Sequence, residues 1–247
     1  KADFNLELKI IKYPEDLAKK IEKLAKGESE PPQFIGFSNY LWNFNISYKF
    51  ASLIKELKIK NCPKIIFGGP NFPIEEIEQF EFLKKQSYID YYIAKEGEGA
   101  WLELITFFEL NRSLDNEEVL LENVCNLVFI SKRGKLKASE IGRIKDITEL
   151  PSPYKAGILD EYLDGRLLPT IQTNRGCPFT CTFCTEGQSI WSRITKKKVE
   201  VVNAEIDYIY AKMMELEPDK RRYDLLITDS NFGMYPEDIE ISKHISK

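Results

Sequence analysis

Three of the five cysteines in the 247-residue sequence lie in one segment, RGCPFTCTFC (175–184). These residues, Cys177, Cys181 and Cys184, have the spacing C-x3-C-x2-C. Thiols this close together can form disulfides, hold a zinc ion or hold an iron–sulfur cluster. An odd number of cysteines disfavours a disulfide network, and disulfides are rare in cytoplasmic proteins. The segment is therefore a candidate metal site.

The number of available ligands separates zinc from iron. A structural zinc site needs four ligands, usually as paired CxxC units. The fourth ligand would be Cys62, Cys125 or His244, and none of these belongs to a paired motif. Three thiolates on a four-iron cluster leave one iron open to a substrate or cofactor. The spacing favours such a cluster, and zinc remains the alternative.

Composition and charge limit the other classes of function. Hydrophobic residues make up 43% of the sequence and charged residues 30%, which is typical of a folded protein. The net charge of −4 argues against nucleic acid as the main partner. No apolar run could span a bilayer and no signal peptide opens the chain, so we expect a cytoplasmic protein without a membrane partner. Lysine at residue 1 and a helical pattern at 237–247 predict a fragment of a longer protein.

The first half of the sequence alternates between strand and helix patterns. Strands are predicted at 6–10, 34–38, 64–67 and 88–94, and helices at 14–27, 46–57, 73–85 and 98–110. This order predicts an α/β fold with a Rossmann-like parallel sheet, whose first strand–helix unit lies upstream of residue 1. Ligands bind such sheets at the carboxyl ends of the strands. The loops predicted there are SNYLWN (38–43), GGPN (68–71) and KEGEG (95–99).

The second half begins differently. A hairpin is predicted at 126–139 and an extended linker at 149–157, followed by a strand at 168–173 and the cysteine loop. A helix at 199–215 and a strand at 225–228 that ends in DSNFG (229–233) begin a second parallel unit. We therefore divide the chain into an α/β domain (1–112), a hairpin and linker (113–164) and the start of a second domain (165–247).

A strand, NRGCPFTCTFC and an amphipathic helix together resemble the radical SAM family. The resemblance implies a partial (β/α) barrel with a 4Fe–4S cluster on Cys177, Cys181 and Cys184. It also implies that S-adenosylmethionine chelates the open iron and is cleaved to a 5′-deoxyadenosyl radical, which abstracts hydrogen from the substrate. We predict no catalytic side chain in this chain, because the cofactors perform the chemistry.

The resemblance also suggests residues that hold S-adenosylmethionine. Phe183 occupies the position of an aromatic residue that the family places against adenine; the alternative is ordinary core packing. The family holds the methionine amino group at the end of the second barrel strand, often through Gly-Gly-Glu, which is absent here. Asp229, Ser230 and Asn231 offer oxygen acceptors at that place. The alternative is a turn built from Asp and Asn.

The front domain resembles that of radical SAM enzymes with an N-terminal cobalamin-binding domain. In that branch the nucleotide tail of cobalamin lies along the carboxyl edge of the sheet, where paired glycines allow close approach. The residues predicted to line this site are Ser38, Tyr40, Trp42, Gly68, Gly69, Glu96 and Gly97. The alternatives are a common Gly-Gly-Pro turn, helix capping by Glu96 and Glu98, and a core position for Trp42.

Many cobalamin domains supply a histidine to cobalt, but no histidine precedes His244 here. The resemblance implies a cobalamin-dependent radical SAM enzyme and allows radical methyl transfer to a small-molecule substrate. The expected partner is an electron donor such as flavodoxin or ferredoxin, and the fragment alone is expected to be inactive. The alternatives are a radical SAM enzyme whose front domain no longer binds cobalamin and a zinc-stabilised α/β binding module without catalysis.

Overall fold

The computed structural model describes residues 6–247. The chain divides between Ile144 and Lys145 into two compact units, 1–144 and 145–247. Over the described residues, every helix is too short or too polar to cross a bilayer.

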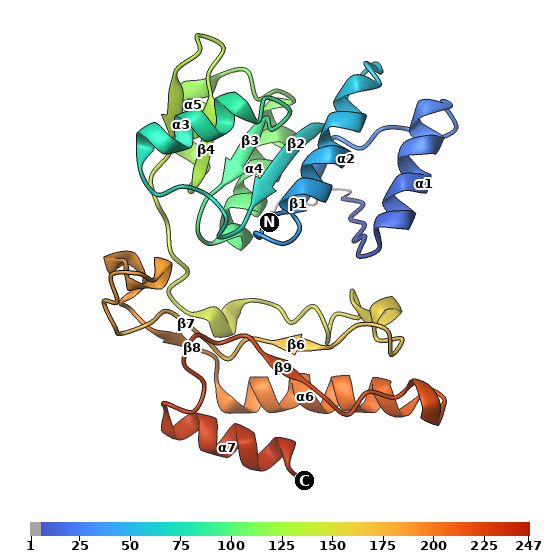
Figure 1. The fold of residues 1–247 in the computed structure, drawn as a ribbon, viewed down its shortest axis with the longest axis vertical. Coiled ribbons are helices and arrows are strands. Elements are labelled where there is room, and N and C mark those ends of the chain that lie inside the picture. The colour runs from blue at the N-terminus through green and yellow to red at the C-terminus, as the bar shows by residue number, and fades with distance from the viewer. Residues whose placement is uncertain (1–5) are drawn as a thin grey trace. The chain divides into compact units, whose positions relative to one another are not determined.

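The first unit contains a five-stranded sheet in the order β1-β2-β3-β4-β5 (Figure 1). The first three strands are parallel, and β4 and β5 continue the sheet in antiparallel pairing. The predicted α/β class with a parallel sheet is confirmed. The strands are β1 (Phe34–Ser38), β2 (Lys64–Gly68), β3 (Tyr91–Ile93), β4 (Leu127–Ile130) and β5 (Leu136–Ala138). The helices are α1 (Pro14–Ala25), α2 (Phe44–Glu56), α3 (Glu76–Lys85), α4 (Gly97–Asn111) and α5 (Glu117–Asn123).

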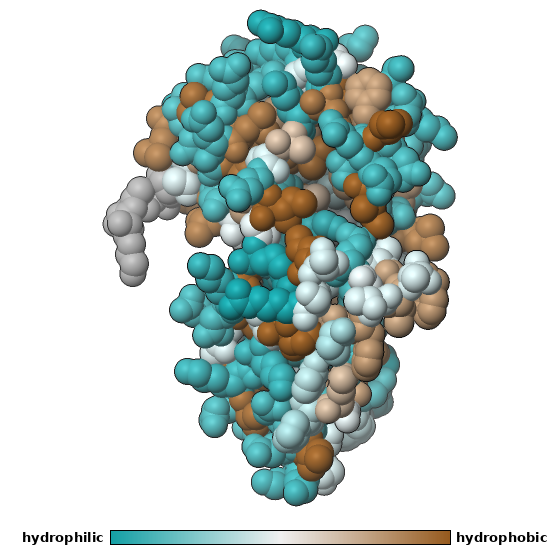
Figure 2. Space-filling view, turned by 90° about the vertical axis from the view of Figure 1, so that its left-hand side faces the viewer, coloured by the Kyte–Doolittle hydropathy of each residue, from teal (hydrophilic) through white to brown (hydrophobic). Residues whose placement is uncertain are grey.

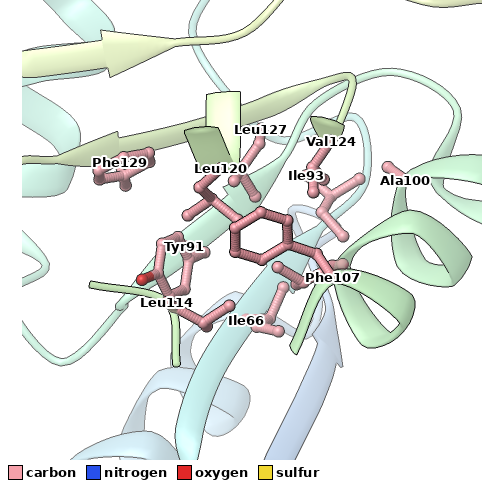
Figure 3. Packing of buried hydrophobic residues seen from close by; sticks show 11 residues of the cluster. Ile66, Tyr91, Ile93, Ala100, Phe107, Leu114, Leu120, Val124, Leu127 and Phe129 are labelled. Atoms are coloured by element: carbon pink, nitrogen blue, oxygen red, sulfur yellow. The ribbon is translucent and has the colours of Figure 1, made fainter. Parts of the chain in front are cut away.

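One face of this sheet is covered by α4 and α5. Phe107 of α4 and Leu120 of α5 are buried in one cluster with Tyr91 and Ile93 of β3. In Figure 3 the Phe107 side chain extends from α4 into the middle of this cluster. Because successive residues of a strand point to opposite faces, the strand residues of this cluster alternate with those of the opposite face.

The opposite face is covered by α2 and α3. Ile54 of α2 and Leu83 of α3 pack in a second cluster with Ile65 of β2 and Tyr92 of β3. Burial on both faces explains why these strands are short, nearly continuous apolar runs. The two clusters hold the parallel strands rigidly and so fix the loops at their carboxyl ends.

The strand predicted at 6–10 is wrong, because residues 6–13 form no regular element. Leu6 and Leu8 are exposed, so their alternation with polar residues has no buried face to match. A strand also needs a neighbouring edge to pair with. The first unit therefore has three parallel strands, and the predicted hairpin at 126–139 forms the β4–β5 end of its sheet.

The second unit has two small sheets. The parallel pair is β6 (Thr170–Ile171) with β9 (Leu226–Ile227), and the antiparallel pair is β7 (Asn174–Arg175) with β8 (Thr195–Lys196). The helices are α6 (Val199–Met214) and α7 (Pro236–Ile245). Helix α6 connects the β7–β8 hairpin with β9 and buries Val202, Ile209 and Met213 in the core of this unit.

Hydrophilic residues cover most of the face shown in Figure 2, and hydrophobic residues form separate patches on it. Single exposed apolar residues are normal on protein surfaces. Large aromatic side chains in loops at the ends of strands are more informative, because ligands bind there. In the described residues, Trp42 and Phe183 are exposed side chains of this kind.

Candidate functional site

The carboxyl ends of the parallel strands bring together the residues predicted to hold cobalamin. Ser38 at the end of β1 lies opposite Gly68 of β2, and Gly68 lies opposite Ile93 of β3. The three loops that follow these strands therefore leave from one edge of the sheet. This is the edge where open α/β sheets bind ligands.

A buried network joins two of these loops. The Asn39 side chain is fully buried and donates from Nδ2 to the Asn71 carbonyl at 2.6 Å and to the Tyr92 hydroxyl at 3.0 Å. The Tyr92 hydroxyl in turn donates to the Gly69 carbonyl at 2.8 Å. Burial raises the pKa of Tyr92 well above its usual value, so the phenol keeps its proton and remains a donor. The network fixes the loop after β1 against the loop after β2.

The paired glycines are needed by the protein chain itself. Gly69 has a φ of +129°, and a Cβ atom there would lie 2.6 Å from the carbonyl oxygen of Asn39. A Cβ atom on Gly68 would lie 3.3 Å from the carbonyl oxygen of Ile93. The close approach at Gly69 is therefore made by the backbone of the neighbouring loop. A side chain at Gly69 would disturb folding before it disturbed any ligand.

Two aromatic side chains of the loop after β1 are exposed. Tyr40 and Trp42 stack with their ring centroids 4.7 Å apart and an angle of 13° between the planes. Trp42 is 81% exposed, so its alternative assignment to the core is wrong. Beside them, Asn43 donates to the Ser38 hydroxyl at 3.1 Å and accepts from the Tyr40 amide at 2.8 Å. This short hydrogen-bonded loop presents a flat aromatic surface at the carboxyl edge of the sheet.

Glu96 has a structural role that the sequence did not reveal. It stands at the N-cap of α4, directly before Gly97, where the helix dipole favours a carboxylate, but its side chain makes no capping hydrogen bond there. Its buried carboxylate accepts from the Ile144 amide at 2.5 Å and pairs with Arg143 at 3.5 Å. Glu96 therefore fastens the segment after β5 to the start of α4. Its predicted role in cofactor binding stays a prediction.

The cysteine loop is closed at its base by the β7–β8 hairpin. The Cys177 amide donates to the Trp191 carbonyl at 2.9 Å, which brings the two sides of the loop together. Gly176 has a φ of +103°, and a Cβ atom there would lie 2.5 Å from the same Trp191 carbonyl oxygen. A Cβ atom on Gly187 would lie 2.3 Å from the carbonyl oxygen of Cys181. Both glycines are thus required for the loop to fold back on itself.

The three thiols of this loop are free, with Cys181 and Cys184 exposed and Cys177 half-buried. The Cys184 amide donates to the Cys181 carbonyl at 3.1 Å, so these two lie on one turn. Within residues 6–247, no three His, Cys, Asp or Glu side chains converge on a common metal position. Three accessible thiols in one compact loop match the donors of an iron–sulfur cluster. The His244 ring bonds the Asp207 carboxylate at 2.7 Å, and His244 belongs to no group of three possible metal ligands in the part of the chain that the structure describes.

The other two cysteines are different in character. Cys62 and Cys125 are both half-buried, and Cys62 contacts the Ile54 carbonyl at 3.9 Å. Burial, together with the neighbouring Glu103 carboxylate, raises the pKa of Cys125 to about 11. Its thiol is therefore protonated at neutral pH, and a protonated thiol is a poor metal ligand.

The loop after β9 contains the residues predicted to hold the methionine part of S-adenosylmethionine. Asp229 accepts hydrogen bonds from the backbone amides of Thr173 and Asn174, at 2.7 and 3.2 Å. It also accepts from the Thr173 hydroxyl and, at 2.8 Å, from the Asn174 amide group. Burial raises the pKa of Asp229, although these hydrogen bonds oppose the rise. Asn231 is half-buried, and its Nδ2 atom makes no hydrogen bond within the described residues.

Phe183 lies in the cysteine loop and is 91% exposed. Its alternative assignment to the core of the loop is therefore wrong. An exposed aromatic ring next to Cys184 is free to stack on a planar ligand. The predicted contact with adenine stays a prediction.

Comparison with known proteins identifies the relatives of this chain. No protein-family model matches the sequence. The chain is 30% identical over 243 residues to the cobalamin-dependent radical SAM methyltransferase TokK of Streptomyces tokunonensis. The match covers 95% of this chain but only 32% of TokK. This chain is a homologue of cobalamin-dependent radical SAM methyltransferases. The predicted resemblance is confirmed, and the chain spans about a third of the length of TokK and of a second curated relative, a 2-(S-pantetheinyl)-carbapenam-3-carboxylate methyltransferase.

Solved structures of cobalamin-dependent radical SAM proteins share the fold of this homologue. The enzyme OxsB, with aqua-cobalamin and S-adenosylmethionine bound, superimposes with a TM-score of 0.68 at 21% identity. The match covers 94% of this chain and 30% of OxsB. The methyltransferase TsrM of Kitasatospora setae, with cobalamin and a [4Fe-4S] cluster bound, gives a TM-score of 0.61 at 15% identity and covers 93% of this chain and 42% of TsrM.

Three residues of the candidate sites in this radical SAM homologue were not predicted from the sequence. Asn39 and Tyr92 lock the sheet edge, and Glu186 of the cysteine loop accepts a hydrogen bond from the Ser230 hydroxyl. Asn39 and Asn71 each follow a parallel strand closely, which could have indicated a polar link between the two loops. Glu186 stands two residues after Cys184, but nothing in the local pattern indicated its partner.

Proposed function

We propose that this chain forms the cobalamin-binding domain and the beginning of the radical SAM core of a cobalamin-dependent radical SAM methyltransferase. The observation that supports this most strongly is the 30% identity to TokK across 95% of the chain. The C-x3-C-x2-C spacing and the three sheet-edge loops support it further, because the spacing fits an iron–sulfur cluster and both features match what the resemblance to this family implies.

In this proposal Cys177, Cys181 and Cys184 hold a 4Fe–4S cluster, and Phe183 stacks on the adenine of S-adenosylmethionine. The compact loop limits where the thiols can move, because Gly176 and Gly187 allow its two sides to pack closely. When bound, the cluster supplies the electron that cleaves S-adenosylmethionine to a 5′-deoxyadenosyl radical, and cobalamin supplies a methyl group for transfer. The protein binds and orients these groups.

The cobalamin site in this proposal is the carboxyl edge of the first unit. The network of Asn39 and Tyr92 holds the edge rigid, and the stacked pair of Tyr40 and Trp42 offers an apolar surface to the cofactor. Residues 1–144 contain no histidine, so they supply no histidine ligand to cobalt. The affinity then depends on contacts made along the sheet edge.

The proposal also assigns partners by chemistry. The cluster needs one electron for each cleavage, and a flavodoxin or ferredoxin is the class of donor that supplies it. The acceptor of the methyl group is a small molecule with an unreactive carbon. The enzyme is thus a transferase that needs both an electron donor and a small-molecule substrate.

Metal analysis tests this function directly. We expect the full-length protein, purified and reconstituted without oxygen, to be brown and to contain about four irons and four sulfides per chain. We expect this composition because three thiolates in one loop are the ligand set of a four-iron cluster that keeps one iron open. A colourless protein that contains a single zinc and no labile sulfide would instead favour a zinc-stabilised binding module.

A further inference from the structure

A hydrogen bond joins the cysteine loop to the loop after β9. The Ser230 hydroxyl donates to the Glu186 carboxylate, although 44 positions separate the two residues in the sequence. Glu186 is half-buried and lies two residues after Cys184, whereas Ser230 follows the end of β9. The contact brings a carboxylate to the place where the radical SAM resemblance expects an acceptor for the methionine amino group.

Asp229, the acceptor predicted there from the sequence, is already occupied. Its Oδ1 accepts the backbone amides of Thr173 and Asn174, and its Oδ2 accepts the Thr173 hydroxyl and the Asn174 side-chain amide. A carboxylate has about four lone-pair positions, so these four donors use them all. Asp229 therefore ties β9 to the residues that follow β6 and has no lone-pair position left for an amino group of a ligand.

The loop that contains Ser230 is held in place from its other end. The buried Asp238 carboxylate accepts the amide of Gly233 at 2.8 Å and that of Tyr235 at 3.0 Å. Lys196 of β8 pairs with Glu237 at 3.0 Å and lies over the Tyr235 ring at 3.8 Å. The loop is thus fixed both at the start of α7 and at Asp229, and Ser230 lies next to Asp229.

We propose that Glu186 binds the amino group of S-adenosylmethionine and that Ser230 positions the Glu186 carboxylate. This inference rests on the proposed function. Ser230 uses one of the lone-pair positions of the carboxylate, so Glu186 keeps acceptors for the N–H groups of the ligand. A hydrogen bond from an amino N–H group to an ionised carboxylate is stronger than one between neutral groups. Glu186 takes the role that Gly-Gly-Glu performs elsewhere in the family.

The test compares two ligands on full-length reconstituted enzyme. S-adenosylmethionine contains the amino group, whereas 5′-methylthioadenosine lacks the whole amino-acid part. We expect Glu186→Gln to weaken S-adenosylmethionine binding about tenfold or more, because hydrogen bonds to charged groups are the stronger kind. We expect its affinity for 5′-methylthioadenosine and its iron content to stay unchanged. Ser230→Ala should weaken S-adenosylmethionine binding about threefold, because it leaves the carboxylate less well oriented.

Glu215→Gln is the matched control, since the Glu215 side chain is exposed at the end of α6, where it pairs with Lys212 at 3.4 Å. This variant should leave the affinity for S-adenosylmethionine, the affinity for 5′-methylthioadenosine and the iron content unchanged. If Glu186→Gln binds S-adenosylmethionine as the wild type does, the inference is overturned and the proposed function stands. If Glu186→Gln loses iron or weakens both ligands equally, Glu186 supports the loop and the inference is also overturned. A wild type that binds neither iron nor S-adenosylmethionine would overturn the proposed function itself.

Discussion

Replacing Glu205 by alanine is expected to destabilise α6 by about 3 kcal/mol, because it would leave the largely buried Lys197 without a counter-charge. The Lys197 ammonium lies 3.1 and 3.0 Å from the two carboxylate oxygens of Glu205. The Glu205 side chain is only 3% exposed and that of Lys197 15%. Hydrogen exchange of the α6 amides in the full chain would measure the loss as a lower free energy of opening.

Two further variants separate burial from charge. Glu215→Ala removes the more exposed of two carboxylate partners of Lys212 and leaves Asp160 in place at 3.3 Å, so it should change the stability of α6 by less than about 0.5 kcal/mol. The double variant Lys197→Met/Glu205→Leu should regain most of the lost stability, since a buried ion pair can often be replaced by apolar residues. Equal effects of Glu205→Ala and Glu215→Ala would contradict the burial argument.

Single cysteine variants are expected to divide into two groups by their iron content. Cys181→Ala should lose most of the iron of the reconstituted full-length enzyme, because two thiolates cannot hold the cluster. Cys177→Ala and Cys184→Ala should behave in the same way. Iron and acid-labile sulfide per chain, measured after anaerobic reconstitution, would show the difference.

The controls are Cys62→Ala and Cys125→Ala, which should keep about four irons per chain. Both thiols are half-buried, and burial with Glu103 holds the Cys125 thiol in its protonated form. Similar iron loss in all five variants would show that the loss reflects damage to the fold, and the ligand assignment would then fail.

The regular core of the first unit could be predicted from the sequence because its signals are local. The apolar run at 64–67 is buried on both faces from Ile65 to Phe67, and the run at 34–38 is half-buried beside it. Helical spacing of apolar residues identified α2 and α4. The alternation at 6–10 misled the prediction because it says nothing of a pairing partner. The sequence also did not show that the hairpin at 126–139 would pair with β3, since that contact is long-range.

The candidate sites, like the fold, could be predicted from the sequence only where the residues that act together are neighbours in the chain. The cysteine spacing identified a metal site, because the ligands are neighbours in the sequence. The roles of Gly69 and Asp229 depend on partners far along the chain: the backbone of Asn39 for Gly69, and the Thr173 hydroxyl and amide for Asp229. The sequence suggested that both residues face a ligand, and that stays a prediction; the structure adds contacts within the protein that the sequence did not reveal. Such contacts become visible only when the fold brings the strand ends together.

Titration of the full-length protein with hydroxocobalamin tests the central claim most directly. We predict saturable binding and an affinity about fivefold or more weaker in the double variant Tyr40→Ala/Trp42→Ala, since aromatic surface at the sheet edge would be lost. These side chains are suitable for the test because Trp42 is exposed and can be replaced without disturbing the core. A side chain at Gly69 would instead clash with the Asn39 backbone. Circular dichroism would confirm that the variant is folded. Absence of binding to the wild type, or equal binding by a folded double variant, would contradict a cobalamin site at this edge and favour a front domain that has kept the fold without the cofactor.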